Sequence, residues 1–589
     1  MAEGEEVAQI GEMKYATLQA AVNAATTENS TVTLLKDVTE DITIPTGVTA
    51  MLDLSGKTLT NKAGKHTITV ENGGKLNISD SVGIGVVDNT SHGKAAIYNK
   101  GEVTLNGGTF ERSAEKGTYS LYSDGGNSWY TIANYGTMEI NTGVTVENAG
   151  GYSSMIRNGG DVTADCNLTI EGGNFAGGVN TVKNDSFGVL TINGGNFSNT
   201  AQYVIMNWNK AEITAGTFQT LDTASAVLFT SAYGADDNTV GKLTISGGEF
   251  KHASDTQEMI VDHYDESNSG AAAVTGGRFD ADISKYIPSD YVQSADGTVE
   301  KLGETNAVAK VGGTYYKTLA DAVAAAQDGD TITLLKDAEL TSTLNLAKNI
   351  TIDGQGKYTI KAANSFTVGS DNKTYCVLYV SGEVTLKDVT VNGNEKCRVI
   401  FCDKGKLTID GATITNGKAP NFIGGVYMTS SASFEMKSGS ITGNKNAKGY
   451  QNDEYLQYSS DLWIGANANG ALTAINGGTI GNVFVNANAW SASNPGSFTM
   501  NGGTVTNLYV EHDANYGATF KYNDGTIEHL YLSKENGNGQ SIEVTPVKGV
   551  IYNGGVKEED LVTLTLKYND GATADTTYNV ASGTTITLP

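Results

Sequence analysis

Five short segments of the chain share one pattern: an apolar–polar–apolar strand, a polar residue, a Gly-Gly pair and a second apolar anchor. They are residues 103–110, 168–175, 190–197, 243–250 and 498–505. The closest copies lie about 22 residues apart, from Gly173 to Gly195, within the range of solenoid repeats. A unit this short cannot bury its own apolar face, so the copies must stack on one another.

The glycine content supports tight corners between these strands. The chain has 72 Gly but only 6 Pro among 589 residues, and no Gly-X-Y period, which excludes collagen. Only glycine takes positive φ without steric cost, so glycine at repeated corners explains the excess. The formal net charge of −26 disfavours binding to nucleic acid and to anionic membranes. No apolar run is long enough for a transmembrane helix, and no signal-peptide core is present, so we expect no direct membrane insertion.

A long-range duplication overlies the short repeat. Residues 15–25 and 316–326 have matching helical patterns, and each is followed by a similar strand, at 31–37 and 331–337. In these helices Thr17 and Thr318 are predicted to cap the first turn. An amphipathic helix can cover the open end of a stacked coil, so two such helices predict two solenoids in tandem.

The predicted fold is therefore all-β. Because connections between parallel strands of one sheet are almost always right-handed, we expect right-handed parallel β-helices. The predicted domains are residues 1–302 and 303–560, each a β-helix with an N-terminal cap, and residues 561–589, part of a small β module.

Cysteine usage gives no metal-site spacing. Cys166, Cys376, Cys397 and Cys402 form no CxxC or Cys/His cluster. We expect small buried side chains inside the solenoid, with a Cys397–Cys402 bridge left open as an alternative.

The capping helix followed by Gly-Gly coils resembles the pectate-lyase-like β-helix superfamily, in the adhesive, non-enzymatic branch found in bacterial surface proteins. The resemblance covers roughly residues 7–560 in two copies, including a closing segment with Tyr286 and Tyr291. Residues 561–589 resemble the first part of an internalin-type B repeat. The resemblance implies an extracellular protein of the bacterial cell surface, with its signal and anchor outside this fragment.

Catalytic motifs of the enzymes that share this fold are missing from the sequence. The aspartate clusters of the similar polygalacturonases are absent, and so are HExxH and Gly-x-Ser-x-Gly. We therefore predict no catalytic residues and no required cofactor. The best acidic candidates are Asp262, Asp265 and Glu266, which lie with His263 in a long insertion. These side chains could act in acid–base catalysis or bind calcium. The alternative is a solvated loop without a function of this kind.

Aromatic residues in long corner insertions are the main binding candidates. Exposed rings suit sugar faces or protein partners, although such loops can also fold their rings onto the solenoid. The candidates are Trp129 and Tyr130; Tyr450, Tyr455, Tyr458 and Trp463; and Trp490.

A sharper aromatic pattern lies near the end of the second solenoid. Phe484, Tyr509 and Tyr531 each stand between two aliphatic residues at equivalent positions of three successive coils. If the aliphatic residues point inward, strand alternation sends the three rings outward in one stack. The stack predicts either a flat strip for a ligand or ring packing that stabilises one sheet.

Together these features predict a monomeric bacterial surface adhesin fragment that binds a glycan or a surface protein of another cell. A polysaccharide lyase or glycoside hydrolase, and a structural spacer without ligand, are the alternatives.

Overall fold

The computed structural model describes residues 6–25, 30–115, 128–148, 152–221, 224–232, 240–264, 268–419, 423–429, 431–446, 456–465, 473–487, 495–513, 516–535, 540–567 and 574–581. Within these ranges strands predominate, and there are two α-helices, α1 (Leu18–Ala24) and α2 (Leu319–Ala325). Most strands pair in parallel with a strand one coil earlier and a strand one coil later, so the chain is an all-β parallel solenoid. It divides into two compact units, Met1–Lys301 and Leu302–Pro589.

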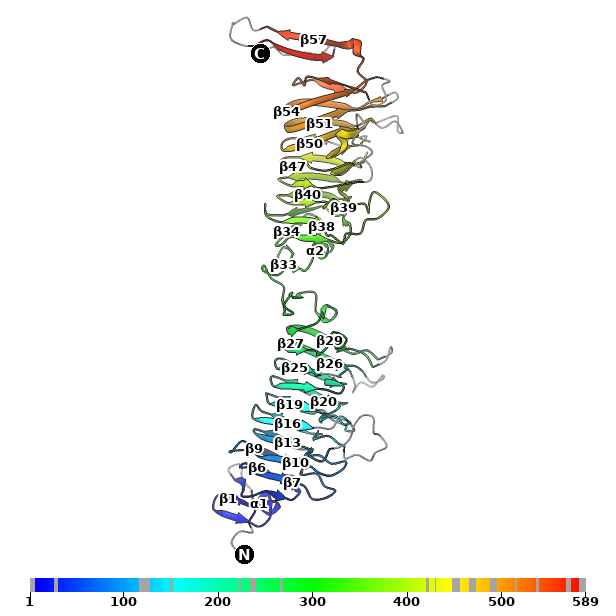
Figure 1. Ribbon diagram of the computed structural model, residues 1–589. Helices are drawn as coiled ribbons and strands as arrows, with labels where there is room; N and C mark the ends of the chain where they lie inside the picture. The colour runs from blue at the N-terminus through cyan, green and yellow to red at the C-terminus, as the bar shows by residue number, and fades with distance from the viewer. Residues whose placement is uncertain are drawn as a thin grey trace. The chain divides into compact units, whose positions relative to one another are not determined.

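Three parallel ladders of strands build the first unit (Figure 1). The first ladder includes β3 (Thr31–Leu34), β6 (Thr49–Asp53), β9 (Lys75–Ser79), β12 (Glu102–Leu105), β15 (Thr137–Ile140), β18 (Cys166–Ile170), β21 (Gly188–Ile192) and β24 (Lys210–Ile213). The second includes β4 (Val38–Thr39), β7 (Thr58–Thr60), β10 (Val86–Asp88), β13 (Gly108–Glu111), β16 (Val144–Asn148), β19 (Asn174–Gly177), β22 (Asn196–Asn199) and β25 (Thr217–Thr220). The long strands β27 (Lys242–Lys251) and β29 (Ala271–Phe279) continue both ladders.

The third ladder of the first unit is a separate sheet. It consists of β5 (Ile42–Ile44), β8 (Ile68–Val70), β11 (Ile97–Asn99), β14 (Ile132–Asn134), β17 (Ile156–Asn158), β20 (Asn180–Asn184), β23 (Tyr203–Asn207), β26 (Ala226–Thr230) and β28 (Glu258–Val261).

The interior of the first unit contains a stack of phenylalanine rings on the second ladder. Adjacent rings in the series Phe175, Phe197, Phe218, Phe250 and Phe279 lie 4.5–4.8 Å apart between centroids and 3–8° from parallel. All five side chains are buried. Each ring is the apolar anchor that follows a glycine corner, so the repeat places one ring above the next.

A ladder of buried asparagines runs through the same interior on the third ladder. The side-chain amide of each asparagine donates to the side-chain oxygen of the asparagine on the next coil, over 2.7–2.8 Å. The series runs from Asn99 through Asn134, Asn158 and Asn184 to Asn207. All five are fully buried. The same amide nitrogens also donate to backbone oxygens at the adjoining turns, as Asn158 does to Cys166 and Val189. These side chains therefore satisfy polar groups at a corner that water does not reach.

The glycine corners have the predicted conformation. The second glycine of the pair takes φ of +111° at Gly173, +109° at Gly195 and +107° at Gly248. At the first position of one pair, Gly172, an added Cβ would lie 2.6 Å from Thr142 Cγ2. The pair thus serves both the turn and the close approach of adjacent coils.

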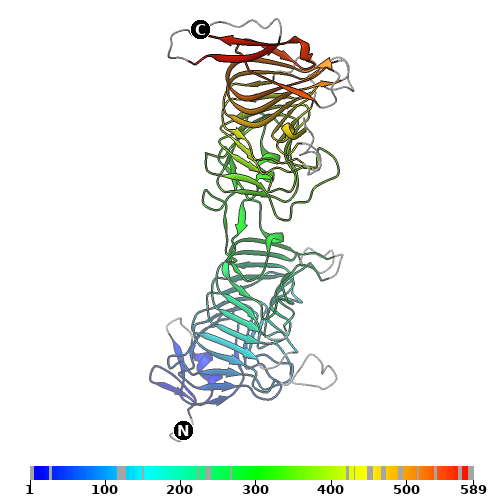
Figure 2. The same ribbon diagram turned by 45° about the horizontal axis from the view of Figure 1, so that its top comes forward.

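The second unit repeats the three-ladder plan (Figure 2). The first ladder includes β34 (Thr331–Leu334), β37 (Ile350–Asp353), β40 (Glu383–Lys387), β43 (Lys406–Asp410), β46 (Ser433–Met436) and β49 (Thr473–Ile475). The second includes β35 (Ala338–Leu340), β38 (Thr359–Ala362), β41 (Thr390–Asn392), β44 (Thr413–Thr415) and β47 (Ser440–Ile441). The third includes β36 (Leu344–Leu346), β39 (Cys376–Val380), β42 (Arg398–Cys402), β45 (Val426–Met428) and β48 (Leu462–Ile464). The longer strands β50 (Thr479–Val485), β51 (Ser497–Val510) and β54 (Thr519–Ser533) each serve more than one ladder.

Both predicted helices begin at the predicted threonines. Thr17 Oγ1 accepts a hydrogen bond from the Ala20 amide, and Thr318 Oγ1 accepts one from the Asp321 amide. Leu18 and Val22 of α1, and Leu319 and Val323 of α2, are buried in the core of their own units. Each helix is followed by the first parallel strand of its unit, β3 or β34, where it covers the apolar cross-section.

The end of the chain forms a hairpin of β57 (Leu561–Leu566) and β58 (Thr576–Ala581). A hydrogen bond 3.1 Å long joins it to the residue that follows β55 (Ser541–Val544): the Thr545 amide donates to the Asn579 carbonyl oxygen. All four cysteines are free and buried, so the Cys397–Cys402 bridge that the spacing left open does not form.

Candidate functional site

A groove with aromatic walls lies on the outer face of the third ladder of the first unit. Its volume is 680 Å³. Residues of β20 and β23, of the turns beside these strands, and of the segments before β14 and β17 form it: Trp129, Tyr130, Tyr152, Ser153, Ser154, Val179, Asn180, Lys183, Asp185, Ser186, Gln202, Met206 and Trp208. The predicted residues Trp129 and Tyr130 are therefore brought together with Trp208 around one cavity.

The rings of this groove are held by other side chains. Trp129 and Tyr130 are half-buried, and their ring centroids lie 5.1 Å apart. The guanidinium carbon of Arg157 lies 5.4 Å from the centroid of Tyr130. Trp208 packs edge-on against Phe229 at 4.9 Å between centroids. Rigid rings of this kind provide apolar contact area at little entropic cost.

Charged groups of both signs share the groove. Asp185 Oδ2 lies 2.8 Å from Lys183 Nζ and 3.0 Å from Arg157 Nη2. Although burial opposes its ionisation, the charges of Lys183 and Arg157 hold the pKa of Asp185 below its ordinary value. Asp185 is therefore a carboxylate that accepts hydrogen bonds at neutral pH, and not a proton donor.

In the second unit the aromatic column is longer than the sequence predicted. Strand pairing places one ring per coil on the outer face of the third ladder. The seven rings are Tyr379, Phe401, Tyr427, Trp463, Phe484, Tyr509 and Tyr531. The outward direction of Phe484, Tyr509 and Tyr531 agrees with the strand alternation.

The expected exposed strip, however, is closed by other side chains. Phe484 is 0% exposed and Tyr509 is 1% exposed; Ile423 belongs to the same buried cluster, and Tyr458 packs against it. The centroid of Tyr458 is 4.6 Å from that of Tyr531 and 6.1 Å from that of Tyr509. Trp463 is also buried, stacked on Phe484 at 4.3 Å. In this structure the column packs as a second apolar core outside the sheet.

Several predicted site residues lie outside the described residues: Tyr450, Tyr455, Trp490, Asp265 and Glu266. Of the predicted acidic site, Asp262 is described. Its carboxylate lies 2.6 Å from Lys285 Nζ and 3.1 Å from His263 Nδ1. Within the described part of the chain, no three His, Cys, Asp or Glu side chains gather as a metal site would require.

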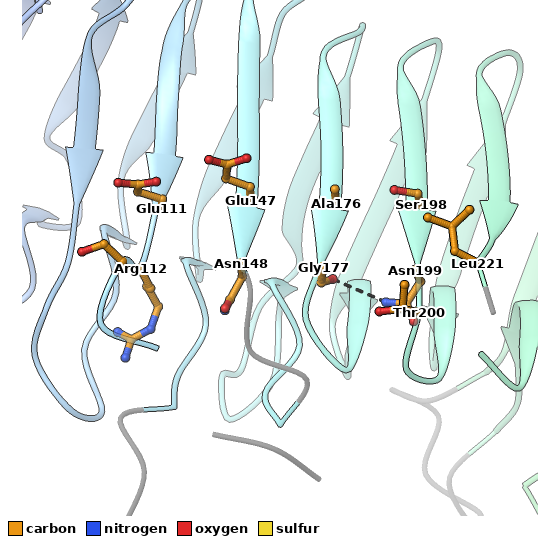
Figure 3. A pocket seen from close by; sticks show the side chains of 11 residues that line it. Glu111, Arg112, Glu147, Asn148, Ala176, Gly177, Ser198, Asn199, Thr200 and Leu221 are labelled. Atoms are coloured by element: carbon orange, nitrogen blue, oxygen red, sulfur yellow. Dashed lines mark hydrogen bonds between the residues drawn. The ribbon is translucent and has the colours of Figure 1, made fainter. Parts of the chain in front are cut away.

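A second groove of the first unit contains a carboxyl pair that sequence reasoning missed (Figure 3). Glu111 of β13 and Glu147 of β16 lie side by side on adjacent strands at its edge, and the cavity measures 440 Å³. Burial and the nearby charges of Asp88 and Glu147 raise the pKa of Glu111. Such a pair holds a proton more tightly than an isolated glutamate does.

Glu511, which follows β51, is a carboxyl group of the second unit whose pKa is shifted by its surroundings. Its Oε2 accepts hydrogen bonds from Asn486 Nδ2 and from the Ala487 amide, both 2.7 Å long. Burial raises the pKa of Glu511 to about 7, although these two bonds favour the charged form. The protonated form therefore stabilises the fold; this contribution is complete below the ordinary glutamate pKa of 4.5 and is lost as the pH rises through about 7.

We accordingly expect Glu511→Gln to be more stable than the parent protein at about pH 8, by about 1–3 kcal/mol. Denaturant unfolding at a series of pH values measures the difference, which should disappear near pH 4 because both side chains are then neutral. The exposed residue Glu528 provides the control, since Glu528→Gln should change the free energy of unfolding little at either pH. A difference for Glu511→Gln that persisted at low pH would contradict the assignment.

Neither a protein-family model nor a curated protein matches this chain. Of the helices in the described ranges, none has the length and apolar character needed to cross a membrane.

Proposed function

We propose that this chain is a fragment of a bacterial cell-surface adhesin, and that the aromatic groove of its first unit binds a glycan. The observation that carries the proposal is the combination of Trp129, Tyr130 and Trp208 around one cavity with amide, hydroxyl and charged side chains between them. Sugar rings present an apolar face and a rim of hydroxyl groups, and this lining offers partners for both. In this proposal the protein is extracellular and monomeric, and the solenoid is the rigid scaffold on which the groove is built.

Calorimetric titration of the full chain with neutral oligosaccharides, chosen from a glycan-array screen, tests the proposal. We expect Trp129→Ala combined with Tyr130→Ala to weaken binding at least about tenfold, because buried aromatic anchors dominate binding energy. Tyr315→Ala, a half-buried tyrosine of the second unit, is the matched control and should leave affinity unchanged. Binding that survives loss of both rings would exclude the groove, and binding of host proteins alone would favour a protein partner.

The Glu111–Glu147 pair favours one alternative, glycoside hydrolysis. Glycosidases use two carboxyl groups, one of which has a raised pKa and acts as the general acid. Release of reducing sugars from neutral polysaccharides, abolished by Glu111→Gln and by Glu147→Gln, would establish the hydrolase; absence of both binding and release would favour a spacer.

A further inference from the structure

We infer that the ligand is an extended, linear, neutral glycan that lies along the solenoid axis and crosses several coils of the first unit. The inference rests on the glycan-binding function proposed above. It adds that the aromatic groove is one half of a longer binding surface, and that a single terminal sugar would fill only part of it.

The other half is a second groove of 680 Å³ on the preceding coils. Tyr98 of β11 lies in it, together with Tyr135 and Gly136, which follow β14. The aromatic groove lies on β20 and β23 of the same ladder.

Arg157 of β17 joins the two grooves. Its Nη2 lies 3.0 Å from Asp185 Oδ2 in the aromatic groove and 3.9 Å from Asp161 Oδ2 in the preceding groove. Its guanidinium carbon lies 5.4 Å from the ring centroid of Tyr130 and 5.8 Å from that of Tyr135. One flat cation therefore contacts a ring and a carboxylate of each groove.

The backbone beside Arg157 is shaped to admit this side chain. Gly160 has φ of +124°, and a Cβ added there would lie 2.1 Å from Arg157 Nη2. Any other residue at this position would displace the guanidinium. The glycine at position 160 thus leaves the space that the Arg157 guanidinium occupies between the two grooves.

The preceding groove has a row of aromatic rings of its own. The centroid of Tyr98 lies 4.4 Å from that of His66, in a stacked arrangement, and 5.3 Å from that of Tyr135. Parallel strands lie about 4.8 Å apart, so the five coils from β11 to β23 span roughly 20 Å. Rings placed along that distance match a chain of several sugars better than one sugar.

The charges of the surface indicate a neutral polymer. Along the two grooves the carboxylates outnumber the lysines: Glu102, Asp161, Asp165 and Asp185 face Lys100 and Lys183. The formal net charge of the whole chain is −26, which repels a polyanion at long range. A neutral glycan avoids this repulsion and keeps hydroxyl groups for the polar lining.

Calorimetric titration of the full chain with neutral linear oligosaccharides, from a disaccharide to an octasaccharide, tests the inference. We expect affinity to rise with length by roughly tenfold or more before it levels off, as successive rings are engaged. Tyr98→Ala should remove this gain for long oligomers and leave the disaccharide affinity unchanged, whereas Trp129→Ala should weaken every length. Tyr98→Leu, which keeps apolar volume, provides a second variant if the alanine form unfolds, and Tyr315→Ala is the control.

Two results would overturn the inference in different ways. If affinity were equal for all lengths and Tyr98→Ala did not change it, the site would bind only a short glycan. The proposed glycan-binding function would then stand without the extended surface. Absence of binding to every oligosaccharide would remove the inference together with the proposed function.

Discussion

Replacing Asn158 by alanine should destabilise the first unit by about 3 kcal/mol, one of the two largest effects that we expect from a single substitution. The amide of Asn158 donates to the side-chain oxygen of Asn184 and to the carbonyl oxygens of Cys166 and Val189. Its own side-chain oxygen accepts from Asn134. Alanine would leave these groups buried without their partner, and each unsatisfied group costs about 1–3 kcal/mol.

Asn141 is a matched control for this experiment. Its amide also donates to an asparagine of the preceding coil, Asn106, over 2.9 Å, but this pair lies at the exposed outer surface. Water can replace the lost partner there, so Asn141→Ala should change the free energy of unfolding by no more than about 0.5 kcal/mol. Denaturant unfolding of both variants measures the contrast; equal losses would show that burial is not what gives the asparagine ladder its strength.

The repeat, the glycine corners and the two capping helices could be predicted because each is encoded within a few neighbouring residues. Thr17 and Thr318 stand directly before apolar residues at helical spacing. The second glycine of each corner, as at Gly195, is required by the turn itself. None of these predictions needed knowledge of which coil lies beside which.

The asparagine ladder was missed because its signal is spread over coils of unequal length. Asn99 and Asn134 each stand two residues before a glycine, and this local pattern can be read from the sequence. Successive members lie between 23 and 35 residues apart, because insertions of different lengths separate the coils. The hydrogen bonds became evident only once the strands had a register.

The candidate sites depend on the same missing register. Glu111 and Glu147 are neighbours in space, but the long segment between β13 and β16 hides this in the sequence. Trp129 and Tyr130 were predicted as binding residues, whereas the groove that they share with Trp208 was not. For Phe484 and Tyr509, alternation predicted the direction correctly, but the cover comes from Ile423 and Tyr458 in corner insertions, whose path no periodic pattern describes.

The second large effect is expected at the phenylalanine stack, where Phe197→Ala should cost about 3–5 kcal/mol. The ring is 1% exposed and lies between Phe175 and Phe218, with centroids 4.5 Å and 4.8 Å away. Alanine would leave a cavity that both neighbours line, and the rigid strands on either side limit its collapse.

Phe197→Leu is the conservative comparison, and it should cost less than about 1.5 kcal/mol because most of the apolar volume remains. Since each coil contacts only its neighbours, the alanine variant should also uncouple the coils before Phe197 from those after it. Differential scanning calorimetry would then show a broadened or divided transition for the first unit in Phe197→Ala, and a shifted but undivided one in Phe197→Leu. If the alanine and leucine variants unfolded alike, ring stacking would not be what couples these coils, and stability would have to come mainly from the strand ladders themselves.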